Sequence, residues 1–149
     1  MHQNQNVDRI FRSGMILYSA YLIASVIYGV VMVGFAMTGW AGMLDDPGVA
    51  AWLVPMAFTA LAVVIVLTRE IWTAKVFNQA INTGGTVVDG LSAAHVLRLL
   101  LNEAIAVMGL AGYLMLGNIF LAGPFVAVGI AALYRSRPNK GQWLEGSSS

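Results

Sequence analysis

Long uncharged stretches alternate with short polar segments along the chain, and their spacing predicts four membrane-crossing helices. Residues 13–40 carry no charged side chain, and residues 49–68 form a second uncharged stretch. Residues 96–116 and 119–134 supply the third and fourth predicted spans. A helix needs about 20 mainly apolar residues to cross the hydrocarbon core of a bilayer. We therefore expect an all-α fold of four transmembrane helices, arranged as two antiparallel hairpins.

Polar segments mark the start and the middle of this pattern. Residues 1–12 begin polar, which is typical of a cytoplasmic or interfacial segment. Residues 69–95 mix charged and apolar side chains and predict an amphipathic cytoplasmic connector. The second helix is expected to continue into this connector as far as a turn at residues 82–85. Ser92 then lies where an N-cap of the third helix is expected.

The third and fourth predicted helices are joined by a very short turn. Only Gly117 and Asn118 separate them, so they are expected to be antiparallel neighbours. The fourth helix is short, and we expect Gly123 and Pro124 to interrupt it.

The composition agrees with a membrane protein and excludes several kinds of site. The chain has 149 residues, of which 58% are hydrophobic and 10% charged, whereas soluble domains have about 25% charged residues. The absence of cysteine excludes disulfides and thiolate chemistry. With two histidines and a net charge of +1, we expect no cofactor, no metal site and no nucleic acid partner. Residues 144–149 (LEGSSS) look like a cloning scar, so the membrane domain is assigned to residues 13–143.

Basic residues gather at one end of the predicted spans. The loop at the opposite end, residues 45–48, contributes two aspartates instead. By the positive-inside rule, this asymmetry predicts that both termini are cytoplasmic. The basic residues are Arg9, Arg12, Arg69, Lys75, Arg98, Arg135, Arg137 and Lys140.

The third helix contains one carboxylate, Glu103, inside its apolar run. If Arg98 marks the cytoplasmic interface, Glu103 lies five residues deeper, or roughly 7 to 8 Å. An ionisable side chain within a membrane helix indicates a functional site. Two interpretations stay open: Glu103 binds a proton or a cation, or it only ties helices together through hydrogen bonds.

Polar side chains of the first and third helices are candidates to surround this carboxylate. His95, Arg98 and Asn102 share one face of the third helix, and Glu103 lies one position around from them. On the first helix, three tyrosines and a serine recur every three or four residues and also share a face. That face supplies either hydroxyl donors to Glu103 or ordinary aromatic packing. Its residues are Tyr18, Tyr21, Ser25 and Tyr28.

Small residues follow Asn102 on nearly the same stripe of the third helix. Ala106, Gly109 and Gly112 allow the backbone of another helix to approach closely. The partner of this packing seam is the first or fourth helix of the same chain or another subunit. A homo-oligomer or a larger membrane complex therefore remains open.

The segment from Arg98 to Leu116, RLLLNEAIAVMGLAGYLML, resembles the carboxylate-bearing helix of the rotor-ring c subunits of rotary ATPases. The shared pattern is a lipid-embedded carboxylate followed by small and branched residues and a Gly-Leu pair, here Gly109 and Leu110. In that family the carboxylate binds a proton or a sodium ion. The resemblance implies such a role for Glu103.

The layout of the whole chain is similar to that of a broad group of uncharacterised bacterial four-helix membrane proteins. The shared order is a basic residue, a glutamate-containing helix, a Gly-Asn turn and a Pro-Phe pair. This resemblance implies a four-helix, multi-pass protein of the bacterial inner membrane and brings no activity with it. The residues are Arg98, Glu103, Gly117, Asn118, Pro124 and Phe125.

Two functional hypotheses follow from these features. The first is a small integral membrane protein that binds or transports a proton or a cation through Glu103. The alternative is a structural or accessory membrane subunit without activity of its own. No phosphate-binding loop, zinc motif or serine triad appears in the sequence, so no enzyme reaction is assigned. The expected partner in either case is the lipid bilayer.

Overall fold

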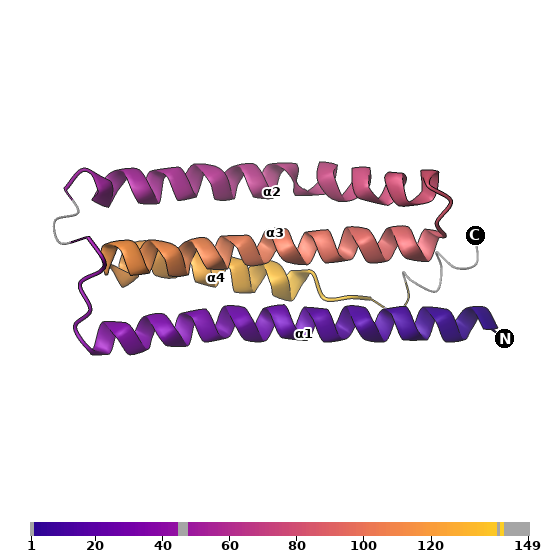
Figure 1. Ribbon diagram of the computed structural model, residues 1–149, viewed down its shortest axis with the longest axis horizontal. Helices are drawn as coiled ribbons and strands as arrows, with labels where there is room; N and C mark the ends of the chain where they lie inside the picture. The colour runs from indigo at the N-terminus through magenta and orange to yellow at the C-terminus, as the bar shows by residue number, and fades with distance from the viewer. Residues whose placement is uncertain (1, 45–47, 140, 142–149) are drawn as a thin grey trace.

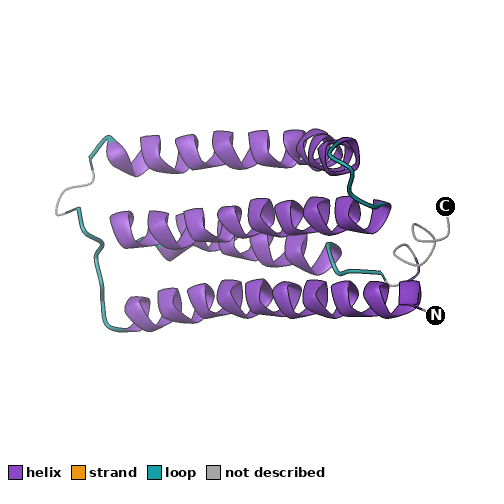
Figure 2. Cartoon of the chain, turned by 45° about the vertical axis from the view of Figure 1, so that its right-hand side comes forward, coloured by secondary structure: helices purple, strands orange, loops and turns teal. Residues whose placement is uncertain are grey.

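The described part of the chain is entirely helical. The computed structural model describes residues 2–44, 48–139 and 141, with side chains from residue 7 onward. Lys140, residues 45–47 of the predicted acidic loop and residues 142–149 lie outside it. Within the described residues there are helices, turns and loops but no strand, which confirms the all-α prediction (Figure 2). The helices are α1 (His2–Met37), α2 (Ala50–Asn82), α3 (Val87–Leu116) and α4 (Ile119–Arg135).

Three of these helices are long and apolar enough to cross a membrane by length and composition. They are the Val7–Met37 part of α1, and α2 and α3 over their full lengths. The fourth helix, α4, is also apolar but has only 17 residues, about 26 Å at about 1.5 Å per residue. Three of the four predicted spans thus lie in helices that are long and apolar enough to cross a membrane, which is consistent with a helical membrane protein.

The third helix is the centre of the bundle. It packs against α1, α2 and α4, and α1 also packs against α4. In Figure 1, α1 and α2 lie on opposite sides of α3. The expected hairpin of the first two helices is therefore not confirmed, because α3 lies between them.

The segment that joins α1 to α2 explains this separation, because it crosses the C-terminal end of α3. The backbone N–H of Met43 donates a hydrogen bond of 2.8 Å to the carbonyl oxygen of Leu114, and a second bond forms one residue further along. At Gly42, which has a φ of +95°, a Cβ atom would lie 2.6 Å from the backbone nitrogen of Gly117. Carbonyls at the end of a helix lack partners within that helix, so these bonds stabilise the crossing.

The start of α3 differs from the prediction. The turn after α2 is confirmed, since α2 ends at Asn82. However, α3 begins at Val87 and not after Ser92, because Thr86 and Asp89 form a capping box. The Thr86 side chain accepts from the backbone of Asp89, and the Asp89 carboxylate accepts from the backbone of Thr86. This reciprocal pair satisfies two helix N–H groups six residues before the predicted start.

The turn between α3 and α4 agrees with the prediction, but the interruption of α4 does not. Gly117 is left-handed with a φ of +65°, and the Asn118 side chain caps the start of α4. The helix then continues through Gly123 and Pro124 to its end. A proline removes only one helical hydrogen bond, and neighbouring helices compensate for such losses in membrane proteins. The prediction that these residues interrupt the helix was therefore wrong.

Candidate functional site

Two adjacent polar residues of α3 face different neighbours. Glu103 reaches α1, whereas Asn102 reaches α2 and α4. Consecutive residues of a helix are separated by about 100°, so the two side chains leave α3 on different sides at almost the same depth. The polar flank predicted for this helix is thus divided between two environments.

On the α1 side, the Glu103 carboxylate accepts one hydrogen bond from the described residues. The phenol of Tyr28 donates to its Oε1 atom over 3.0 Å. Arg69 and Arg98 pair with Glu70, and among the described residues no salt bridge involves Glu103. Glu103 is half-buried, in a helix whose neighbouring positions are mostly apolar. The carboxyl group therefore has a hydrogen-bond donor but no cationic partner among the described residues.

The polar face of α1 divides into hydrogen-bonding and packing positions. Tyr28 bonds to Glu103, but Tyr18 is buried among Leu99 and Leu133, with Tyr21 packed against that cluster. Hydrogen bonding to Glu103 thus describes Tyr28, and aromatic packing describes Tyr18 and Tyr21.

The remaining residue of this face, Ser25, has a distinctive environment. It is fully buried, and its hydroxyl has no hydrogen-bond partner among the described residues. Ser25 precedes Tyr28 by three residues, so the two hydroxyls occupy the same side of α1. An unpartnered hydroxyl therefore lies on the helix face that approaches Glu103.

On the other side of α3, Asn102 joins three helices. Its amide oxygen accepts a hydrogen bond from Arg69 of α2 over 3.3 Å. Its amide nitrogen donates to the hydroxyl of Ser136 over 2.8 Å and to the carbonyl of Ala132 over 3.3 Å. Asn102 is fully buried, so these bonds replace the water that the side chain has lost.

The arginine of α3 does not reach Glu103. Arg98 forms a 2.6 Å ion pair with Glu70 of α2, whose other carboxylate oxygen lies 3.3 Å from Arg69. The side chain of Glu70 is 60% exposed, and exposed pairs of this kind add little stability. Both arginines therefore interact with Glu70 and not with Glu103.

His95 lies three residues before Arg98 and is half-buried. It does not belong to a described metal site: the described residues contain no group of three or more His, Cys, Asp or Glu side chains that could hold a metal ion. We assign His95 no part in the candidate site.

The small residues of α3 lie against two different helices of the same chain. A Cβ atom added to Gly109 would lie 2.7 Å from Val126 of α4, and one added to Gly129 of α4 would lie 2.7 Å from Ala106. Gly112 instead faces Phe58 of α2 at 3.4 Å. Two of the three small residues thus permit the close approach of α3 and α4.

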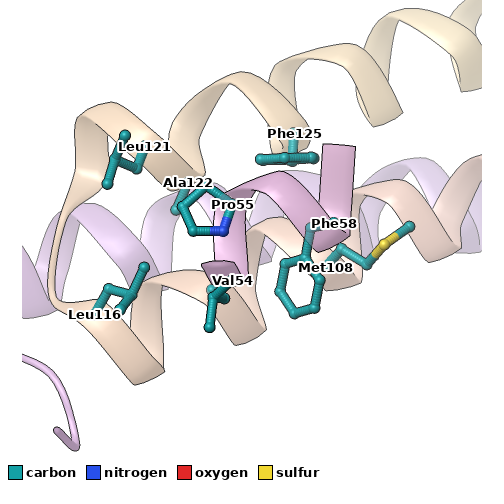
Figure 3. A pocket seen from close by; sticks show the side chains of 9 residues that line it. Val54, Pro55, Phe58, Met108, Leu116, Leu121, Ala122 and Phe125 are labelled. Atoms are coloured by element: carbon teal, nitrogen blue, oxygen red, sulfur yellow. The ribbon is translucent and has the colours of Figure 1, made fainter. Parts of the chain in front are cut away.

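The pocket in Figure 3 lies where α2, α3 and α4 meet. Pro55 and Phe58 of α2 lie beside Leu121 and Phe125 of α4, and the two phenylalanine rings form an edge contact at 6.4 Å. The pocket has a volume of about 10 Å³ and an apolar lining. It has room for about one water molecule and offers no polar partner to bind one, so it is part of the packing.

Sequence reasoning missed two partners of Asn102 and one of Arg98. Arg69 and Glu70 were assigned only to the amphipathic connector at residues 69–95, and Ser136 was not among the candidate site residues. Their position provided a signal: these residues directly follow the uncharged stretches of α2 and α4, at the level where the polar part of α3 begins. Which side chains would pair across helices depends on helix rotation, which the sequence pattern leaves open.

Comparison of the chain with protein-family models, with curated proteins and with solved structures gives no match. Neither resemblance noted in the sequence is therefore supported by a family match. The apolar helices remain consistent with a helical membrane protein.

Proposed function

We propose that this chain is a small integral membrane protein that binds a proton or a monovalent cation at Glu103. The observation that carries the proposal is the contact of Glu103 with Tyr28, without an ion pair among the described residues. A charged carboxylate in an apolar layer needs a compensating cation or a proton. Arg69 and Arg98, the arginines of the neighbouring polar cluster, are engaged with Asn102 and Glu70.

The ligands on the α1 side suit a small hard cation or a proton. Glu103 contributes a carboxylate and Tyr28 a phenol oxygen, and Ser25 lies three residues before Tyr28 on the same face of α1. Oxygen ligands favour hard cations over soft transition metals. The buried Ser25 hydroxyl has unused capacity to donate or accept a hydrogen bond. It is therefore the second position, after Tyr28, at which a bound ion would gain a ligand.

The site has unequal surroundings along the membrane normal. Asn102 and its arginine partner lie one residue away on the side that we assign to the cytoplasm. Beyond Glu103, the rest of α3 carries no charge up to Leu116. We infer that an ion or a proton reaches Glu103 from the basic end of the bundle, with both termini of the protein on that side.

The test is flux in proteoliposomes of the wild-type protein and two matched variants. Glu103→Gln removes the charge but keeps an oxygen that accepts from Tyr28, so we expect it to abolish proton or sodium flux. Glu70→Gln makes the same change in the exposed carboxylate of α2 and should leave the flux unchanged. A carbodiimide should label Glu103 in a pH-dependent manner. Unchanged flux in Glu103→Gln would contradict transport by this site.

The alternative is an accessory subunit without transport activity, in which Glu103 only joins α1 to α3. The observation that favours it is the exposed apolar surface of α2, which includes Trp52, Leu53 and Met56. Chemical crosslinking in native membranes separates the two proposals. A stable heteromeric partner together with absent flux in the wild type would favour the accessory role.

A further inference from the structure

An open groove runs between α2 and α4 on the side of the bundle away from Glu103. Its walls include Ala62 and Val66 of α2 and Pro124 and Val128 of α4, and Ile105 of α3 also lines it. Its volume is about 560 Å³. It is a much larger space than the pocket beneath the Phe58 ring, and it is independent of the proposed ion site.

The lining of the groove suits hydrocarbon. Its one polar lining residue, Thr59, donates its hydroxyl to the carbonyl oxygen of Pro55 over 2.7 Å. That hydroxyl is therefore already satisfied within α2, and the remaining lining side chains are apolar. A polar solute would lose its hydration in the groove without replacement hydrogen bonds. An alkyl chain forms no hydrogen bonds with water and therefore loses none when it enters the groove.

The length of the groove matches one leaflet of a bilayer. Its α2 wall extends from Pro55 to Leu67, which is about 18 Å at about 1.5 Å per residue. Half of the hydrocarbon core of a bilayer is about 15 Å. One acyl chain of a phospholipid therefore fits along the wall, with its headgroup near one end.

One end of the groove is basic on both walls. On α2, Arg69 follows Val66 by three residues and so continues its stripe; on α4, Arg135 follows Val128 by seven and does the same. Arg69 donates to Asn102 through Nη1 and lies 3.3 Å from the Glu70 carboxylate through Nε, and Arg135 is exposed. The apolar groove thus leads to an arginine from each wall at the end where the described basic residues gather.

We propose that this groove binds one acyl chain of an anionic phospholipid, whose phosphate lies between Arg69 and Arg135. The apolar lining binds the chain, and the paired arginines select a negative headgroup. Basic pockets between membrane helices on the cytoplasmic side bind anionic headgroups in this way. The lipid comes from the leaflet that faces the basic end of the bundle.

Native mass spectrometry from mixed micelles tests the headgroup. The wild type should retain phosphatidylglycerol more strongly than phosphatidylcholine. Each arginine near a membrane surface contributes about fivefold in affinity, so Arg69→Gln with Arg135→Gln should weaken phosphatidylglycerol binding about 25-fold. Arg137→Gln removes the same charge off the groove stripe and should change binding less than twofold. Equal retention of both lipids, or an equal loss in Arg137→Gln, would overturn the proposal.

Photolabelling of the unaltered protein tests the groove itself and does not depend on any variant. Phosphatidylglycerol with a photoreactive group in its acyl chain should label residues 59–67 of α2 and 120–128 of α4. Val128→Trp, which fills the groove, should reduce this labelling at least fivefold. Labelling confined to α1, or crosslinks that place a second copy of the chain in the groove, would refute lipid binding there. Ion flux through Glu103 is a separate readout, so either proposal can fail without the other.

Discussion

Polar side chains on the two sides of α3 differ in how many hydrogen bonds they form, although they lie at almost the same depth. Away from α1, Asn102 makes two hydrogen bonds to the end of α4 and one to Arg69 of α2. Toward α1, Glu103 has one hydrogen bond and Ser25 has no partner among the described residues. Satisfied polar groups hold helices together, whereas polar groups with spare capacity can exchange a ligand.

The glycines of α3 and α4 sharpen this contrast. At Gly109 an added Cβ would lie 2.9 Å from the carbonyl oxygen of Ala122, so the α4 side has no room for a further atom. On α1, Gly29 would place a Cβ at an ordinary 3.6 Å from Val126, and Gly34 would meet nothing within 4 Å. The contact of α3 with α4 is therefore closely packed and forms the rigid side of the bundle, whereas α1 approaches Val126 of α4 only at an ordinary van der Waals distance.

The largest expected effect comes from breaking the rigid side. Gly109→Leu forces a side chain into the backbone of α4 and should lower the free energy of unfolding by about 3 kcal/mol. Gly34→Leu, at an open position of α1, should change it by less than about 0.5 kcal/mol. Unfolding in mixed detergent micelles measures both. Equal losses in the two variants would show that α3 and α4 are not closely packed.

Local features of the sequence were sufficient to predict much of this rigid side. The apolar stretches gave the helices, and Gly117 with Asn118 gave the tight turn that makes α3 and α4 neighbours. The start of α3 was missed although Thr86 and Asp89 have capping-box spacing. Ser92 was predicted as the cap because it adjoins the apolar run, and the Thr86–Asp89 pair was overlooked.

The arrangement of α1 and α2 could not be predicted in the same way. A connector between two spans suggests a hairpin, but here it crosses α3 through the contact of Gly42 with Gly117. Such a contact joins residues far apart in sequence and leaves no periodic pattern. The partners of Asn102 were hidden for the same reason, since they depend on how three helices are rotated about their axes.

An intermediate effect is expected from removing the polar junction. Asn102→Leu introduces an apolar side chain of similar size and removes the hydrogen bonds of Asn102 to Arg69 and Ser136. Hydrogen bonds between membrane helices contribute about 0.6 kcal/mol each on average, so the loss of three should cost about 2 kcal/mol. Glu103→Gln should cost less than about 0.6 kcal/mol, because the amide oxygen still accepts from Tyr28. If the Glu103 variant were the less stable one, Glu103 would be the structural residue.

A small change in stability, and the most informative one about function, is expected at Tyr28. Tyr28→Phe removes the one hydrogen bond to Glu103 and should lower the free energy of unfolding by about 0.6 kcal/mol. The same loss in the bound state would weaken proton or cation binding about threefold, which flux at limiting ion concentration measures. Tyr18→Phe removes a hydroxyl next to Leu99 and Leu133 and should leave flux unchanged. Equal flux in both variants and the wild type would mean that Tyr28 only packs, and that the α1 side of α3 holds no ligand.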